Sequence, residues 1–308
     1  MFKNSNTNKR YYTLDYYYKE KYNTKVFKVS LNLGLTCPNK DGTKGYGGCI
    51  YCKNGSGDFA GNKKDNLKEQ FQNIKNMLHK KWPNAKYIAY FQANTNTYAD
   101  INYLKQKYEE VLTYENVLGI NIATRCDAIS EECLNYLEEL NKKTDLTIEL
   151  GLQTIHEKTN KLLNLGYTIQ EFEQTLKKLQ DKNIKVVVHI INGLPFETKQ
   201  MMIETAKYLN SKNIDGIKIH MLHILKDTPL EELYKKEQFH ILTREEYTDI
   251  VCDQLEYLNE NIVINRITGD PKEDDLIEPN WLIKKFCILN EIDKEMKRRD
   301  SYQGKRAK

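Results

Sequence analysis

Three cysteines, Cys37, Cys49 and Cys52, stand within a stretch of sixteen residues. Eleven residues separate the first two and two separate the last two, and no fourth cysteine lies near them. A [4Fe–4S] cluster usually takes four thiolates, so a cluster held by three leaves one iron with an open coordination position. Catalytic metal sites keep such a position for their reactant. The cysteine pattern therefore predicts a cluster that takes part in chemistry.

Other uses of these cysteines stay open. A structural zinc site needs four closed ligands, usually in two pairs, and this chain offers no second pair at the required spacing. A disulfide is disfavoured because the seven cysteines are scattered and no secretory signal is expected. Incidental cysteines are the remaining alternative. The other four are expected to be buried, small and apolar side chains: Cys126, Cys133, Cys252 and Cys287.

The loop GLTCPNKDGTKGYGGCIYC resembles the cluster loop of the radical S-adenosylmethionine (radical SAM) proteins, in the variant with a long first gap. More narrowly, the chain resembles the bacterial subfamily related to the catalytic subunit of Elongator. Further segments match that subfamily in order and extend the resemblance over nearly the whole chain: YFQANTNTYA (90–99), ELGLQTIHEKT (149–159), HIINGLPFET (189–198), DGIKIHMLHILKDTPL (215–230), NRITGDP (265–271) and RRDSYQGK (298–305). The resemblance implies a [4Fe–4S] cluster on the three cysteines, S-adenosylmethionine as cofactor, and a reaction started by a 5′-deoxyadenosyl radical.

Apolar runs and helical periods alternate along the chain. Runs that are continuously apolar predict strands buried on both faces, as in a parallel sheet, at 25–33, 87–91, 117–123, 145–152, 185–191 and 216–222. Capping boxes at Thr168 with Glu171 and at Thr243 with Glu246 mark two helix starts. The predicted fold class is α/β, a partial (β/α)6 TIM-like barrel of the radical SAM type. We expect a basic, tyrosine-rich extension over 1–24, the barrel over 25–240, and a helical extension with a basic tail over 241–308.

In a barrel of parallel strands the chemistry gathers at the carboxyl ends of the strands. Tyr51, between the last two cysteines, matches a family position that packs near the cofactor adenine. After the second strand, Gln92 and Asn94 stand where most radical SAM proteins carry the Gly-Gly-Glu motif that binds the methionine amine. Neutral side chains can accept hydrogen bonds from an ammonium, without the charge assistance of a carboxylate. The alternative is that these side chains only cap the next helix.

Glu149 and Gln153 are four residues apart along the fourth strand, so their side chains face the same side. A carboxylate among apolar neighbours is costly unless it is paired or functional, which makes Glu149 a candidate catalytic or hydrogen-bonding group. The resemblance implies that Gln153 contacts the cofactor's ribose or methionine carboxylate. It also implies that Gly193 and Pro195, after the fifth strand, turn the backbone against the adenine.

Further candidates follow the third and sixth strands. Arg125 and Asp127 keep the charged pair of the family's Arg-Pro-Asp, although Cys126 replaces the proline, and both are catalytic candidates. His220 is expected to point into the barrel, near the adenine or the substrate. His223 is expected in the loop, because residues three apart on a strand face opposite sides. The two histidines are therefore not expected to share a metal ion.

Positive charge gathers at the two chain ends. Residues 1–28 and residues 294–308 each carry seven Lys or Arg against two acidic residues, so each end is +5 while the whole chain is +4. Basic segments with interleaved tyrosines suit the phosphates and unstacked bases of an RNA. The nucleic-acid-binding candidates are Lys9, Arg10, Lys297, Arg298 and Arg299. The alternative is that terminal lysines only keep the protein soluble.

The resemblance implies a tRNA-modifying enzyme. Members of the subfamily convert 5-carboxymethylaminomethyl(2-thio)uridine at the tRNA wobble position to 5-aminomethyl(2-thio)uridine, so tRNA is the expected substrate. A radical SAM reaction on a protein or small metabolite is one alternative, and a non-catalytic iron–sulfur electron-transfer protein, which typically has a fourth cysteine ligand, is another. No apolar run approaches 18 residues, so we expect a cytoplasmic protein without a membrane span. Its electrons would come from an unidentified reductant such as flavodoxin or ferredoxin, and the sequence does not predict its oligomeric state.

Overall fold

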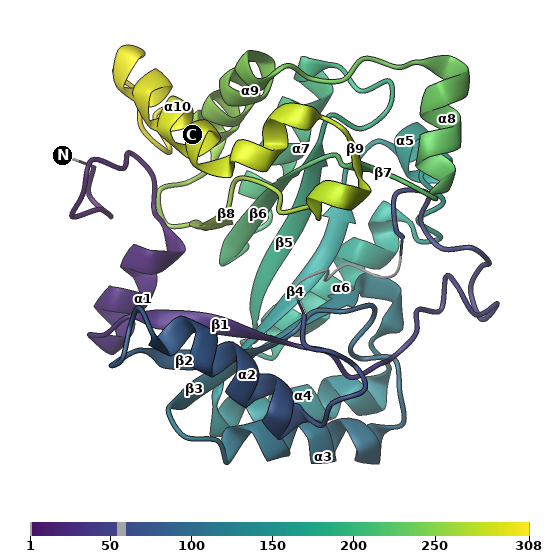
Figure 1. Ribbon diagram of the computed structural model, residues 1–308, viewed down its shortest axis with the longest axis vertical. Coiled ribbons are helices and arrows are strands. Elements are labelled where there is room, and N and C mark those ends of the chain that lie inside the picture. Colours follow the sequence, from purple (N-terminus) through teal and green to yellow (C-terminus); the bar gives the residue numbers. More distant parts are fainter. Residues whose placement is uncertain (1, 54–59, 308) are drawn as a thin grey trace.

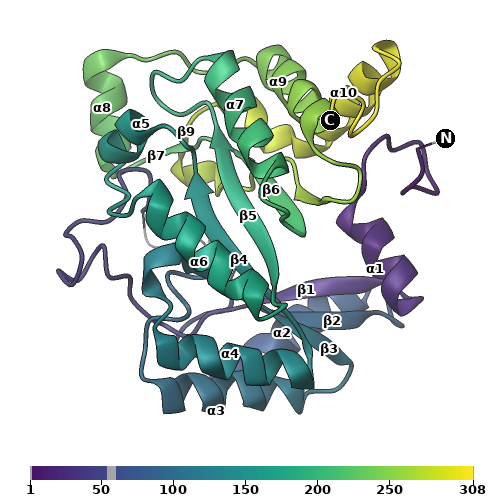
Figure 2. The same ribbon diagram turned by 180° about the vertical axis from the view of Figure 1, so that it is seen from behind.

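The structure is a computed structural model that describes residues 2–53 and 60–307. Within these residues, seven parallel strands form one sheet whose spatial order follows the chain. They are β1 (Val26–Leu31), β2 (Lys86–Phe91), β3 (Val117–Arg125), β4 (Asp145–Gln153), β5 (Lys185–Asn192), β6 (Gly216–Met221) and β8 (Val263–Arg266). Figures 1 and 2 show the sheet curling into an open half-barrel with helices on its outer side. This confirms the predicted α/β partial barrel.

The six predicted strands are present, but the sheet has one more. Strand β8 lies within 241–308, which was expected to be a helical extension, and it pairs with β6 from Gly216↔Val263 to Lys218↔Arg266. The predicted count of six was therefore wrong, because a strand of four residues is too short for its apolar pattern to stand out. A separate antiparallel pair, β7 (Ile224–Leu225) with β9 (Leu276–Glu278), also lies in the C-terminal third.

Helices alternate with the strands. Those between β1 and β6 are α2 (Leu67–His79), α3 (Ile101–Leu112), α4 (Glu131–Lys143), α5 (Glu157–Leu162), α6 (Ile169–Asp181) and α7 (Lys199–Asn210). The C-terminal part adds α8 (Pro229–Glu237), α9 (Arg244–Tyr257) and α10 (Lys285–Arg298). Both predicted capping boxes are confirmed, at the starts of α6 and α9, and α2 begins with a third at Asn66 and Glu69.

The N-terminal segment closes the open side of the half-barrel. Helix α1 (Leu14–Tyr22) follows a bridge between Thr13 and Ile264 of β8, where the Ile264 amide donates to the Tyr12 carbonyl at 2.8 Å. Tyr18 of α1 is buried in a small cluster with Val26 of β1 and with Ile88. Figure 1 shows α1 next to the edge strand β1. Residues 11–24 are therefore part of the barrel wall, not a free tail.

The cysteines outside the cluster loop differ in burial. Cys126, Cys133 and Cys252 are buried, as predicted. Cys287 is exposed, so the prediction of a buried apolar role was wrong for this residue. It lies at the start of α10, one position past Phe286, whose side chain is also exposed. No helix in the described part of the chain is long and apolar enough to cross a membrane.

Candidate active site

A cavity of about 650 Å³ is lined by residues of the barrel strands, of the loops at their carboxyl ends and of the N-terminal segment that carries α1. It brings together residues that are up to 256 positions apart, from Leu14 to Asp270. The predicted residues that line it are Cys37, Cys49, Tyr51, Cys52, Gln92, Asn94, Arg125, Glu149, Gln153 and His220. The fold thus gathers most of the residues that the sequence proposed for the site.

The cysteine loop is anchored on both sides. The Ile50 amide donates to the Leu163 carbonyl at the end of α5, and the Leu230 amide of α8 donates to the Ile50 carbonyl, each at 3.0 Å. Asn39 donates to the Asn164 carbonyl at 2.6 Å and reaches the Cys49 sulfur at 3.7 Å. An N–H directed at a cysteine sulfur favours the thiolate, which is the form that binds a metal, although burial raises the pKa of the Cys49 thiol to about 11. The loop is therefore built to present sulfur ligands to the cavity.

The cysteines fit a cluster better than a single ion. Among the described residues, no three His, Cys, Asp or Glu side chains lie close enough to hold one metal ion. A [4Fe–4S] cluster binds each thiolate through a different iron, so its ligands do not have to converge on one point. Three thiols facing one cavity, with sulfur as the common donor atom, suit an iron–sulfur cluster.

Two predicted cofactor residues have left-handed backbone conformations. Asn94 has φ of +59°, and its side chain donates to the Leu35 carbonyl at 2.8 Å, which ties it to the cysteine loop. Gln153 has φ of +68° at the end of β4, where the pairing with β5 skips one residue. A Cβ on Gly151 would lie 2.7 Å from Nε2 of Gln153, so that side chain folds back over the glycine. Positive φ is uncommon for residues with a side chain and is found often at functional sites.

Arg125 and Asp127 form the predicted charged pair. The guanidinium donates to both carboxylate oxygens at 2.8 and 2.9 Å, and it also donates to the Leu165 carbonyl at 2.8 Å. The central carbon of the guanidinium, Cζ, lies 4.9 Å from the centre of the Tyr167 ring. Arg125 lines the cavity but Asp127 does not. Asp127 therefore orients the Arg125 guanidinium, and the catalytic roles expected of the two residues stay predictions.

Glu149 is buried and fully engaged. Its oxygens accept hydrogen bonds from Lys28 at 2.7 Å, Asn121 at 2.8 Å and His189 at 2.8 Å, and from Lys218. Burial alone would raise the pKa of this carboxyl, but the two lysines and the His189 hydrogen bond lower it well below its usual value. The prediction of a paired carboxylate is confirmed. With its acceptor positions in use, Glu149 holds the lysines in place and is a poor general base.

The histidines lie deeper than the sequence suggested. His220 lines the cavity, and its ring centre is 5.3 Å from that of His189. Burial lowers the pKa of His220 well below its usual value and lowers the pKa of His223 to about 4, so both are neutral near pH 7. His223 lies beyond the end of β6 and also lines the cavity. The expected position of His223 in the loop is confirmed, because β6 ends at Met221, and that loop brings His223 to the same cavity as His220.

Gly193 and Pro195 are not in the cavity wall. Gly193 has φ of +82°, and a Cβ there would lie 3.1 Å from Met221 and 3.3 Å from Leu242. Its amide faces the Met202 sulfur at 3.2 Å. Pro195 is buried and does not line the cavity. Gly193 therefore packs closely at the turn after β5, and the expected contact of the two residues with the adenine stays a prediction.

The residues that sequence reasoning missed are basic or aromatic. Lys28, Lys218, Tyr90 and Arg266 line the cavity, and none was a candidate. Lys28 and Lys218 stand inside largely apolar strands. A charged residue in a buried strand is costly unless it is paired or functional, and that signal was available in the sequence.

The basic chain ends are mostly neutralised by acidic residues of the same chain. Lys9 pairs with Asp293, and Arg10 donates to Asp300 at 3.0 Å. Arg298 donates to Glu295 at 2.7 and 2.8 Å. Each of these cations therefore has an acidic partner in its own chain, and its contact with a phosphate stays a prediction. Among the five predicted residues, Lys297 is exposed and has no ion pair with any residue that the structure describes.

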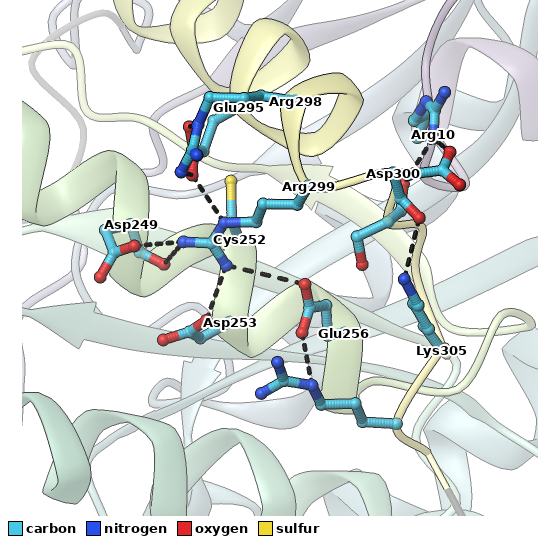
Figure 3. A network of polar contacts seen from close by, with 12 residues as sticks. Arg10, Asp249, Cys252, Asp253, Glu256, Glu295, Arg298, Arg299, Asp300 and Lys305 are labelled. Atoms are coloured by element: carbon cyan, nitrogen blue, oxygen red, sulfur yellow. Dashed lines mark hydrogen bonds and ion pairs between the residues drawn. The ribbon is translucent and has the colours of Figure 1, made fainter.

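Arg299 was predicted to bind nucleic acid, but it is held by carboxylates of its own chain. Figure 3 shows its guanidinium reaching among acidic side chains of α9 and α10. Only 15% of its side chain is exposed, and the nearby carboxylates belong to Asp249, Asp253, Glu256 and Glu295. An arginine held in this way is not available to RNA, and it links the two C-terminal helices.

Comparison with known proteins identifies the family of this chain. The family model described as the radical SAM superfamily matches residues 35–209, and the model of the radical SAM C-terminal domain matches residues 214–298. The chain belongs to the radical SAM superfamily. It is therefore a radical SAM enzyme, and its cofactors are a [4Fe–4S] cluster and S-adenosylmethionine.

Individual relatives extend this result. YtqA of Bacillus subtilis (strain 168) is 48% identical over 302 residues, covering 98% of this chain and 94% of YtqA. A tRNA uridine(34) acetyltransferase of Methanocaldococcus infernus is 26% identical over 168 residues, covering 54% of this chain but 31% of that protein. The structure of archaeal Methanocaldococcus infernus Elp3 with an N-terminal deletion superposes with a TM-score of 0.68 at 19% identity, covering 90% of this chain and 64% of that one. This last match shows a shared fold.

Proposed function

We propose that this radical SAM enzyme modifies the wobble uridine of tRNA and converts 5-carboxymethylaminomethyl(2-thio)uridine to 5-aminomethyl(2-thio)uridine. The observation that carries the proposal is the similarity, over about half of the chain, to a protein named as a tRNA uridine(34) acetyltransferase. The order of motifs along the chain, which resembles the Elongator-related bacterial subfamily, supports the same substrate.

The cavity suits such a substrate in size and charge. Ligand cavities of about 300–1,000 Å³ hold small molecules, and this one, which the substrate would share with the cofactors, has a volume of about 650 Å³. A wobble nucleoside would have to leave the anticodon stack to enter it, as in other enzymes that act on bases. Seven Lys or Arg residues and three Asp or Glu residues line the cavity, and this excess of positive charge favours a nucleotide or another anionic substrate.

Each part of the site has a proposed task. Cys37, Cys49 and Cys52 hold the cluster, while Tyr51, Gln92, Asn94 and Gln153 surround S-adenosylmethionine. When bound, these cofactors supply a radical that can remove hydrogen from an unreactive carbon. His220, neutral and half-buried in the cavity wall, is placed to donate or accept one hydrogen bond to the nucleoside.

We place the tRNA phosphates on a different part of the surface from the basic chain ends that the sequence suggested. Because most of the basic residues at the chain ends are paired internally, we place the phosphate contacts at the rim of the cavity. Lys40 and Lys53 line the cavity in the loop that holds the cysteines. Lys40 makes no ion pair with any described residue, whereas Lys53 pairs with Asp275 at 2.8 Å.

Mass spectrometry of tRNA nucleosides from a strain that lacks the gene tests the proposal. We expect 5-carboxymethylaminomethyl(2-thio)uridine to accumulate and the aminomethyl form, with anything made from it, to disappear. Purified protein with a reconstituted cluster, S-adenosylmethionine and a reductant should then convert the accumulated nucleoside in isolated tRNA. Unchanged nucleosides in the deletion strain would overturn the proposal and favour a protein or small metabolite as substrate.

A further inference from the structure

Below the loops that carry the cysteines, side chains from four strands meet at the floor of the cavity. Lys28 of β1 and Lys218 of β6 both bond to Glu149 of β4, and Lys218 also donates to the Tyr90 hydroxyl at 2.8 Å. The side chains of Lys28 and Lys218 are only 14% and 9% exposed. Two ammonium groups are thus held side by side in a place that water reaches poorly.

This group carries more positive than negative charge. It contains two lysines and one carboxylate, and His189 adds no charge near pH 7 because burial lowers its pKa to about 4. Burial lowers the pKa of Lys218 to about 7, and the neighbouring charge of Lys28 acts in the same direction, despite the contact with Glu149. An uncompensated buried charge is costly, and a bound anion removes that cost.

Within the described residues, no other carboxylate of the cavity wall is placed to supply the missing negative charge. Besides Glu149, the acidic residues that line the cavity are Asp15 and Asp270. Asp15 pairs with Lys19 at 2.8 Å and with Lys25, and Asp270 pairs with Arg266 at 3.3 Å.

The two lysines also keep hydrogen-bond donors for a ligand. An ammonium has three N–H groups. Hydrogen bonds between described residues occupy one N–H of Lys28 and two of Lys218. Since Glu149 already accepts from four residues, it offers these remaining donors no further acceptor.

We propose that Lys28 and Lys218 form an anion subsite at the cavity floor that binds a carboxylate of the substrate. A single surplus charge matches one carboxylate. Glu149 stands four residues before Gln153 on β4, about 13 Å along an extended strand. The subsite is therefore separate from the end of the cavity where the cofactor residues lie. We identify this carboxylate with that of the carboxymethyl group of the modified uridine, and this identification rests on the proposed function.

A first experiment tests the subsite without assuming a substrate. Holoenzyme with a reconstituted cluster is heated in sodium acetate and in sodium chloride of equal ionic strength. Acetate near its Kd should raise the Tm of the wild type by about 1 °C relative to chloride. Lys28→Met and Lys218→Met should lose this rise. Lys25→Met is the matched control, because Lys25 also lines the cavity but has its own partner in Asp15. Equal Tm values for the wild type in the two salts would overturn the subsite.

A second experiment identifies the carboxylate. The nucleoside 5-carboxymethylaminomethyluridine and its neutral carboxamide are titrated into the same holoenzyme with S-adenosylmethionine. The wild type should bind the acid roughly tenfold or more tightly, since a charged hydrogen-bonded contact is lost in the amide. The two lysine variants should bind both ligands equally while still releasing 5′-deoxyadenosine without substrate. Stabilisation by acetate without any preference for the acid nucleoside would keep the subsite and reject this substrate.

Glu149→Gln separates ligand binding from a structural role. The variant keeps both lysines and removes the carboxylate that they neutralise. If they bind an anion, removing the competing carboxylate should preserve or enlarge the effect. A loss of the acetate effect in Glu149→Gln, with release of 5′-deoxyadenosine intact, would overturn the proposal.

Discussion

Replacing Arg299 by Met should destabilise the protein without weakening tRNA binding. The side chain is 15% exposed and lies within 3.6 Å of carboxylates on Asp253 and Glu256, whose side chains are 13% and 3% exposed. Removing one partner of a buried ion pair costs about 3–5 kcal/mol. Here Lys199 still pairs with Asp253, and Arg306 with Glu256. We therefore expect a loss of about 2 kcal/mol, or a Tm lower by roughly 4 °C.

The pH dependence of this loss gives a second measurement. Hydrogen bonds from Arg298 and Arg299 lower the pKa of Glu295 to about 2, although burial opposes them. A carboxyl with a lowered pKa stabilises the fold above its unfolded pKa of about 4.3, and the contribution disappears as the pH falls toward the folded value. Urea unfolding should show the full difference between wild type and Arg299→Met at pH 7 and a smaller one near pH 3.

Lys297→Met is the matched control for Arg299→Met. It removes the same charge from an exposed position two residues earlier, so it should leave the unfolding free energy within about 0.5 kcal/mol of wild type. The salt dependence of tRNA binding should not change in Arg299→Met. A fall in the slope of log affinity against log salt by about 0.7–0.9 in that variant, with wild-type stability, would refute this reasoning and restore Arg299 as a phosphate ligand.

Two further predictions concern the cofactors. Replacing Cys37, Cys49 or Cys52 by Ala should abolish both the brown iron–sulfur chromophore and the cleavage of S-adenosylmethionine, whereas Cys133→Ala in α4 should keep both; a full cluster in the triple variant would reject the assignment. Gln153→Ala should weaken cofactor binding by about 1–3 kcal/mol, measured by equilibrium titration of S-adenosylmethionine, and an unchanged Kd would remove Gln153 from the site.

The sequence by itself determined where strands and helices form and which loop carries the cluster cysteines. Strand positions followed from apolar runs, and helix starts followed from capping boxes, because both depend on residues close together in the chain. The three cysteines also lie close together, so their chemistry could be inferred from spacing alone. Because parallel strands bring their carboxyl ends to one edge, residues such as Gln92 and Gln153 could be expected in one place.

Only the tertiary structure decided how charges are paired. Lys28 and Lys218 bond to Glu149, 121 and 69 positions away, and the register of the strands, not a local pattern, makes these contacts. Contacts between distant parts of the chain also changed the interpretation of Arg299. It looks like a surface cation in the sequence, but in the structure it contacts carboxylates 43 and 46 positions away. A charge is free or neutralised according to its neighbours in space, and the folded chain alone specifies those neighbours.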